Sequence, residues 1–232
     1  MRSIESIARA AASPVRLAIL ALSATLIGVV QAQPANALAG FGAADSAQLP
    51  AAPWTLELLP QQQMAQTDFR VQDSNGRSVL RIEANASYGN LLHRVDRLPS
   101  KTFLSWQWRL EAINGLADLR SKQADDTSAK VCVLFDMAVE RVPFIERQLL
   151  RMARASSGSD LPAATVCYVW DARLPAGSRV DNAYSRRVRY LVLRSGMSPK
   201  TQWFSERRDI GADFQALFGD ESAGEMPRLK AI

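Results

Sequence analysis

The chain has 232 residues, of which 47% are hydrophobic, and its formal net charge is +5 at pH 7. Residues 1–37 hold three arginines and one glutamate, so 25 of the 28 basic and 22 of the 23 acidic side chains lie after them, a net charge of +3. This mild excess does not favour nucleic-acid binding. A single histidine, His93, excludes histidine-rich metal sites, and we expect neither a metal nor a cofactor.

Residues 1–37 have the layout of a secretory signal peptide. Arginines precede a run without charges at 17–30, and Ala35-Asn36-Ala37 is a small-x-small cleavage site. The run is short for a membrane span, which needs about 20 apolar residues. We predict cleavage after Ala37, with Leu38 as the new first residue, and a periplasmic or secreted protein that meets the membrane only during export. The alternatives are cleavage at Val30-Gln31-Ala32 and an uncleaved anchor.

After a flexible lead-in at 38–52, the rest of the chain, 53–232, alternates short β-rich runs with turn signals. One of these signals, Asn75-Gly76, predicts a hairpin turn, because Asn-Gly suits the positive φ of a type I′ turn. The predicted strands are 54–58, 67–72, 78–84, 91–95, 102–110, 130–136, 164–170, 187–194 and 202–207, and a further strand begins near Glu225. Helices are predicted at 143–154 and 209–218, the second ending at Gly219. This order predicts one mostly β domain, a two-sheet antiparallel jelly-roll-like sandwich with one inserted amphipathic helix and a short C-terminal helix.

The clearest strand, 102–110, has strict alternation. Its apolar set is Leu104, Trp106, Trp108 and Leu110, and its polar set is Ser105, Gln107 and Arg109. Because side chains alternate across a strand, the tryptophans are expected in the core and the polar set on the opposite face.

Cys132 and Cys167 lie in two similar runs, VCVLFD and VCYVWD. An oxidising compartment permits a disulfide, but a direct cross-strand bridge is geometrically restricted. We therefore expect two buried thiols, with a disulfide as the alternative.

Two arginine-rich segments have alternative interpretations. In the helix at 143–154, Ile145, Leu149 and Met152 form an apolar stripe, and the arginines Arg147, Arg151 and Arg154 form another. We expect the apolar stripe to pack on the domain and the basic face to be solvated; contact with anionic lipid or a protein partner is the alternative. The run at 185–194 interleaves arginine with aromatic residues, and we expect an edge strand that its charges protect from pairing.

Five segments in this order resemble the bacterial family of unknown function DUF3047. They are 104–110 (LSWQWRL), 124–126 (ADD), 129–136 (AKVCVLFD), 165–170 (TVCYVW) and 203–219 (WFSERRD followed by DFQALFG). The resemblance covers residues 53–232. It implies an exported β-sandwich protein similar in shape to carbohydrate-binding jelly rolls, and glycan binding only by analogy of fold. Relatives continue with an Asp- and Asn-rich turn and a final strand that this sequence does not match, so we expect truncation at the C-terminus.

The candidate ligand-binding residues fall into two groups. The first is an expected concave surface where sugar rings stack on exposed aromatics and fixed donors bind hydroxyls: Gln107, Arg109, Tyr168, Trp170 and Arg208. For Trp170, a place in the core is the alternative. The second group is acidic, with Asp125 and Asp126 before a strand and Asp136 at the end of one.

These residues support three hypotheses. The first is a non-catalytic binding module for glycan or another envelope component. The second is an envelope-glycan hydrolase that uses Asp125, Asp126 or Asp136, which needs two carboxylates about 5–5.5 Å or about 6.5–9.5 Å apart. The third is a protein-interaction module that uses the helix at 143–154. No residue is assigned as catalytic, and no loop has calcium-site spacing.

Overall fold

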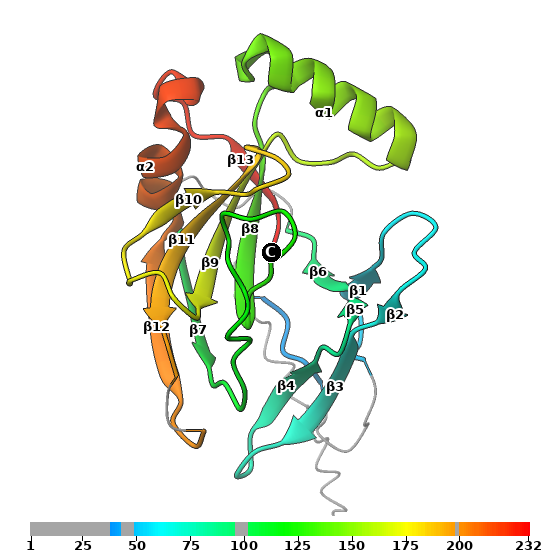
Figure 1. Ribbon diagram of the computed structural model, residues 1–232, viewed down its shortest axis with the longest axis vertical. Coiled ribbons are helices and arrows are strands. Elements are labelled where there is room, and N and C mark those ends of the chain that lie inside the picture. Colours follow the sequence, from blue (N-terminus) through cyan, green and yellow to red (C-terminus); the bar gives the residue numbers. More distant parts are fainter. Residues whose placement is uncertain (1–37, 43–48, 96–101, 198–199) are drawn as a thin grey trace, which may run out of the picture. The chain divides into compact units, whose positions relative to one another are not determined.

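The computed structural model (Figure 1) describes residues 38–42, 49–95, 102–197 and 200–232. The predicted signal peptide and most of the predicted cleavage site lie outside these residues. Short β-strands make up most of the regular structure, which confirms a mostly β domain. No helix within the described ranges is long and apolar enough to span a bilayer.

A five-stranded sheet forms the centre of the domain. Its strands, in spatial order, are β10 (Arg179–Asp181), β11 (Val188–Ser195), β9 (Ala164–Asp171), β8 (Ala129–Asp136) and β13 (Arg228–Ala231). Every residue of β9 is buried, because β9 has a strand on each side and packed layers on both faces. Neighbours pair antiparallel except β9 and β11, which are parallel.

The other strands form two-stranded pairs. They are β1 (Trp54–Glu57) with β6 (Asn90–His93), β2 (Ala65–Gln66) with β5 (Ser87–Tyr88), β3 (Asp68–Asp73) with β4 (Ser78–Glu83), and β7 (Phe103–Trp108) with β12 (Phe204–Asp209). Pairing of β2 with β5 is also parallel. The all-antiparallel expectation is therefore wrong at two pairings, and the jelly-roll-like sandwich stays a prediction.

The predicted turn at Asn75-Gly76 is confirmed. The turn between β3 and β4 has positive φ at Asn75 (56°) and Gly76 (77°), as a type I′ turn requires. Helix α2 (Ile210–Ser222) begins after Asp209, whose side chain accepts hydrogen bonds from the backbone N–H groups of the first turn. It does not end at Gly219 as predicted but continues by one turn to Ser222.

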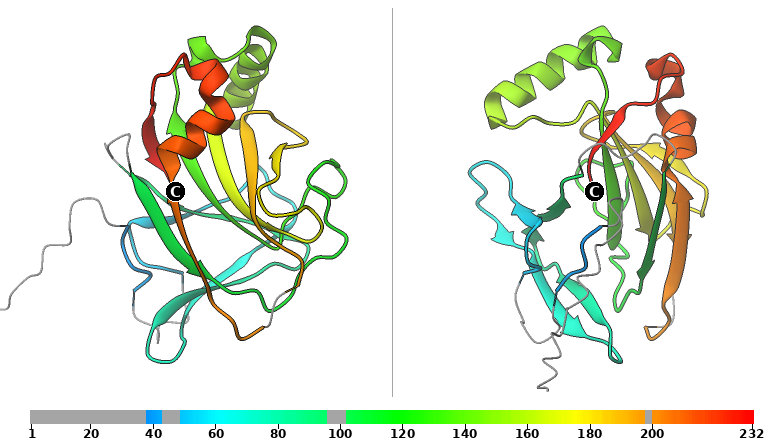
Figure 2. Two further views of the ribbon diagram at one scale, coloured as in Figure 1. Left: turned by 90° about the vertical axis from the view of Figure 1, so that its left-hand side faces the viewer. Right: turned by 180° about the vertical axis from the view of Figure 1, so that it is seen from behind.

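The central sheet has a core on each face. On one face, Tyr168 and Trp170 of β9 contact Trp106 and Trp108 of β7, with ring centroids 5.2 Å and 5.6 Å apart. Helix α2 covers the same face (Figure 2). There the ring centroids of Phe214 and Phe135 are 4.7 Å apart. The prediction that the tryptophan side of β7 faces the core is confirmed. On the other face, a small cluster around Cys167 and Val169 packs under Leu119.

Cys132 and Cys167 form a disulfide, so the expectation of two free thiols is wrong. The antiparallel register of β8 and β9 places them directly opposite each other, with their Cα atoms 4.0 Å apart. This short separation is typical of a non-hydrogen-bonded cross-strand pair, where the side chains approach most closely.

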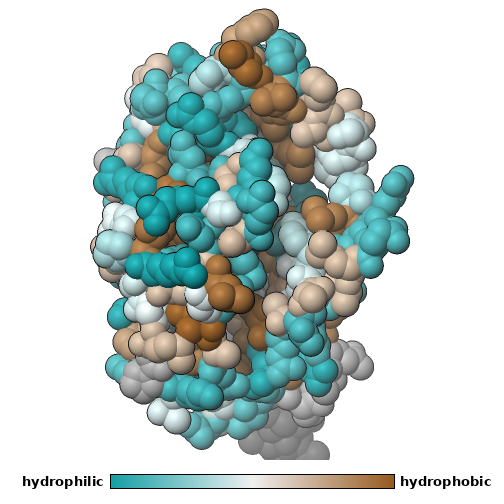
Figure 3. Space-filling model, in the orientation of Figure 1, coloured by the Kyte–Doolittle hydropathy of each residue, from teal (hydrophilic) through white to brown (hydrophobic). Residues whose placement is uncertain are grey.

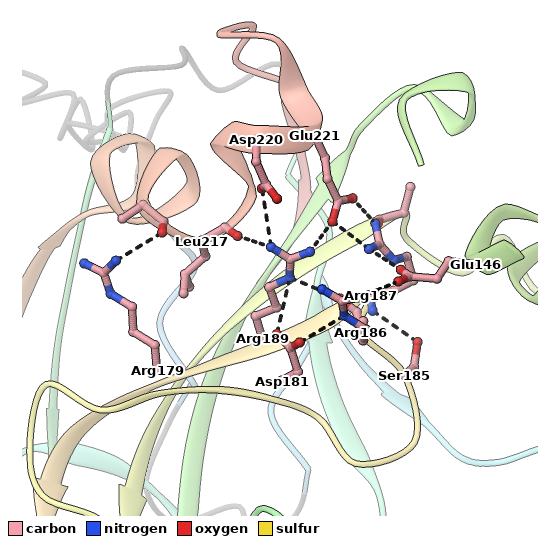
Figure 4. A network of polar contacts seen from close by, with 12 residues as sticks. Glu146, Arg179, Asp181, Ser185, Arg186, Arg187, Arg189, Leu217, Asp220 and Glu221 are labelled. Carbon is pink, nitrogen blue, oxygen red and sulfur yellow. Dashed lines mark hydrogen bonds and ion pairs between the residues drawn. The ribbon is translucent and has the colours of Figure 1, made fainter. Parts of the chain in front are cut away.

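Strand β11 lies between β10 and β9, so the expected edge strand is wrong. Arg189 of this strand and Arg187 just before it are buried because acidic side chains from both helices pair with them (Figure 4). Arg187 and Arg189 both pair with the carboxylate of Glu221 on α2, and Arg187 also pairs with Glu146 on α1 (Phe144–Ser157). The three side chains around Glu221 are 6–7% exposed.

Helix α1, which follows the single-turn η1 (Val139–Arg141), packs opposite to the prediction. Its one buried residue is Leu150, and Arg154 donates to the carbonyl of Leu161. The predicted core stripe, Ile145, Leu149 and Met152, is 74%, 59% and 67% exposed. The buried ion pair of Glu146 and the backbone contact of Arg154 hold the helix by its polar side.

Candidate functional site

A groove of about 390 Å³ opens between α2, β12 and the β10–β11 hairpin. The apolar side chains of Leu191 and Leu193 of β11 form its floor, whereas the side chain of Val192 between them packs on the other face of the sheet. Its walls carry charged side chains from all three elements: Arg179, Glu206, Arg208 and Asp213. The groove therefore combines an apolar floor with polar walls, as small-molecule sites commonly do.

The alternation of side chains along β12 brings Glu206 and Arg208 into the groove. Phe204, Glu206 and Arg208 share the face toward the central sheet, whereas Ser205 and Arg207 are exposed on the other face. Because α2 starts directly after β12, Asp213 in its first turn lies next to Arg208. Because α2 follows β12 directly, the ion pair of Arg208 and Asp213 lies in the groove.

Asp213 is buried and binds two donors. Tyr168 Oη donates to its Oδ2 at 2.8 Å, and Arg208 Nε donates to the same oxygen at 2.9 Å. The hydrogen bond that Arg208 donates to Asp213 raises the pKa of Arg208, and burial raises the pKa of Tyr168. Both groups therefore remain protonated donors at neutral pH.

Glu206 forms a second ion pair, with Arg194. Its Oε1 accepts from Arg194 Nε at 2.7 Å and from Trp108 Nε1 at 3.1 Å. Arg194 in turn stacks on the ring of Phe204, 4.3 Å from its centroid. At the rim, Arg179 Nη1 donates to the carbonyl of Ala216 at 3.2 Å.

This arrangement can hold a polar ligand through fixed hydrogen-bonding groups. Both carboxylates are ion-paired with an arginine whose side chain is about one-third exposed. A partly exposed guanidinium keeps donors available for a hydroxyl or an anionic group.

The predicted concave surface is only partly brought together. Arg208 lines the groove and Tyr168 lies behind it, but Tyr168 and Trp170 are fully buried. Trp170 packs between Trp108 and Phe204 and donates from Nε1 to the carbonyl of Gly196. The expectation that these aromatics form an exposed stacking surface is therefore wrong.

Gln107 and Arg109 lie on the outer face of the β7–β12 pair, away from the groove. Gln107 Nε2 donates to Ser205 Oγ at 2.9 Å. Arg109 pairs with Glu111 at 2.9 Å and stacks on Trp203, 5.0 Å from its centroid. Strand alternation, which put them opposite the tryptophans, also separates them from Arg208.

The predicted aspartates do not form one site. Asp125 and Asp126 lie in the loop before β8, where Asp125 contacts Tyr190 and Asn182, whereas Asp136 is the last residue of β8. Asp136 lines a different groove, of about 290 Å³, beside Arg141 and Glu225. Neither Asp125 nor Asp126 lines the groove of Asp136.

Asp125 and Asp126 fix the loop that covers the second face of the sheet. Asp125 accepts from Tyr190 Oη at 3.2 Å and also binds Asn182, and burial raises its pKa. Asp126 accepts from Asn114 Nδ2 at 3.1 Å and from the backbone of Thr127. Their oxygens thus have structural partners within the chain.

Sequence reasoning missed Glu206, Asp213, Arg194 and Arg179. The alternation of Phe204, Glu206 and Arg208 was a usable signal, because it assigns all three to one strand face. Asp213 gave no such signal, since its role depends on Tyr168, which is 45 residues away in sequence. Among the residues that the structure describes, no cluster of His, Cys, Asp or Glu could hold a metal ion.

Comparison with known proteins gives one match. The model of a family described as "Protein of unknown function (DUF3047)" matches residues 52–232. No curated protein and no solved structure matches the chain.

Proposed function

Since the chain belongs to the DUF3047 family of proteins of unknown function, we propose that its β domain is a non-catalytic binding module for glycan or another hydroxyl-rich envelope component. The observation that carries the proposal is the groove with two ion-paired carboxylates, Glu206 and Asp213. Sugars are bound in proteins by fixed donors and acceptors of this kind over an apolar floor. The jelly-roll-like sandwich that the resemblance implies belongs to the same proposal.

The groove can be tested by filling it. Ala216 is exposed on α2 and lines the groove, so Ala216→Trp should place an indole in the ligand's space without disturbing the core. We expect retention on peptidoglycan sacculi, measured by co-sedimentation, to weaken at least about tenfold, the equivalent of about 1.4 kcal/mol. Ala155→Trp, on an exposed position of α1, is the matched control and should bind like the wild type.

Three results would contradict the proposal. Equal retention of both tryptophan variants would place binding elsewhere. A folded wild type that is retained neither on sacculi nor on exopolysaccharide would remove the glycan ligand. Release of reducing ends that disappears in Glu206→Gln would establish the second candidate, a hydrolase, which the presence of two carboxylates in one groove favours.

We also propose that the protein acts in the periplasm or outside the cell, after removal of residues 1–37. A fusion of residues 1–45 to a reporter that is active only in the periplasm should give signal. Mass spectrometry of the exported protein should place its first residue at Leu38. An intact Met1 in the cytoplasmic fraction would contradict this localisation.

A further inference from the structure

Helix α1 presents an unusual surface. Phe144, Ile145, Leu149 and Met152 are all more than half exposed. Ile145, Leu149 and Met152 follow one another along one side of the helix at spacings of four and three residues, and Phe144 adjoins them at the first turn. Figure 3 shows hydrophobic surface over α1 at the top of the molecule. A contiguous apolar surface of this kind on a soluble domain usually marks a contact site.

The polar side of α1 is fixed to the domain. Glu146 pairs with the buried Arg187, Arg154 donates to the carbonyl of Leu161, and Leu150 is buried. The helix therefore cannot turn its apolar side inward without breaking a buried ion pair, which is costly. It also cannot enter a deep protein groove, because its other side is already occupied by its own domain.

The charge of α1 identifies the kind of partner. The helix holds three arginines and one glutamate, and the glutamate is turned inward onto Arg187. Arg151 is exposed beside the apolar side, and the guanidinium of Arg147 lies 5.9 Å from the ring of Phe144. The outward side of α1 is therefore apolar with a positively charged border.

From this combination we propose that α1 docks the protein on the surface of an anionic lipid bilayer. The four apolar side chains would enter the boundary between headgroups and acyl chains, while the arginines contact lipid phosphates. Long basic side chains suit this position, because their apolar stems lie along the apolar surface while their charged ends stay in water. The contact is independent of the groove, so the proposed glycan binding can fail without affecting it.

Vesicle co-sedimentation tests the proposal. The exported protein, with its N-terminus verified by mass spectrometry, is mixed with vesicles of phosphatidylcholine alone or with about one-third phosphatidylglycerol. We expect binding to the anionic vesicles that weakens at high salt. The triple variant Ile145→Ser, Leu149→Ser, Met152→Ser should lower the partition coefficient at least about tenfold, since its three apolar side chains no longer enter the bilayer.

Matched variants distinguish a specific contact through α1 from nonspecific binding of the protein to vesicles. The control triple Leu58→Ser, Leu59→Ser, Met64→Ser removes apolar residues that are 43–51% exposed and should bind like the wild type. Arg151→Glu should weaken binding to anionic vesicles, whereas Arg120→Glu, at an exposed loop position, should not. Circular dichroism should show that every variant is folded.

Several outcomes would overturn the proposal. These are equal binding by the α1 triple and the control triple, no binding of folded wild type to anionic vesicles, or equal binding to both vesicle types. A wild-type dimer in sedimentation that the α1 triple converts to a monomer would also overturn it, because the apolar side would then cover a second copy of this chain.

Discussion

Glu221→Ala should lower the free energy of unfolding by about 3–5 kcal/mol, the largest effect that we expect from a single substitution. The carboxylate of Glu221 lies between the guanidinium groups of Arg187 and Arg189, and all three side chains are buried. Its removal leaves two positive charges in the interior of the domain. Arg187 would keep Glu146, but Arg189 would keep only the more distant and more exposed Asp181 and Asp220.

Urea unfolding measures this loss as a lower transition midpoint. The control is Asp220→Ala, the neighbouring residue on α2, whose carboxylate is 75% exposed and 3.7 Å from Arg189. An exposed pair contributes little, so this variant should stay within about 0.5 kcal/mol of the wild type. If Glu221→Ala also stayed in that range, the network would not hold α2 on the sheet.

Replacing both cysteines by alanine should lower the free energy of unfolding by about 2–4 kcal/mol. The disulfide joins residues that are 35 apart in sequence, and its loss gives the unfolded chain more freedom. The reduced wild type should unfold at nearly the same urea concentration as the double variant, because both lack the covalent link.

A thiol titration gives the independent measurement. Denatured but unreduced protein should react with almost no thiol reagent, and after reduction it should react with one equivalent for each of its two cysteines. Full reactivity before reduction would contradict the disulfide and would restore the interpretation of Cys132 and Cys167 as buried thiols.

Local sequence patterns predicted the individual strands and turns of this fold more accurately than they predicted which strands pair with one another. The Asn75-Gly76 turn and the alternation in β7 depend on adjacent residues, and both are confirmed. The cysteines show where this kind of reasoning stops. The sequence runs VCVLFD and VCYVWD predicted two strands, but only the pairing of β8 with β9 sets Cys132 opposite Cys167.

Charge and periodicity were similarly ambiguous. The arginines at 185–194 were interpreted as protecting an exposed edge of an exported domain. Glu221, more than thirty residues later, neutralises Arg187 and Arg189 inside the domain. The amphipathic pattern correctly predicted helix α1, but such a pattern does not determine which side of the helix packs against the domain. There the buried ion pair of Glu146 decides the orientation.

The same limit applies to the candidate site. Arg208 was predicted and does line the groove, whereas its partner Asp213 depends on the turn from β12 into α2. Trp170 shows the opposite error, because an aromatic residue next to a polar strand end is compatible with either a binding surface or a core. Its neighbours Trp108 and Phe204, far from it in sequence, place it in the core.

The pairing of β7 with β12 has a consequence for how the chain folds. Gln107 and its partner Ser205 are 98 residues apart. At a synthesis rate of about 5–20 residues per second, β7 therefore waits roughly 5–20 s for its partner strand. During that time the side of β7 that carries Trp106 and Trp108 lacks part of its final cover. Because such a long-range pairing slows folding, this apolar surface stays exposed for longer, which favours aggregation.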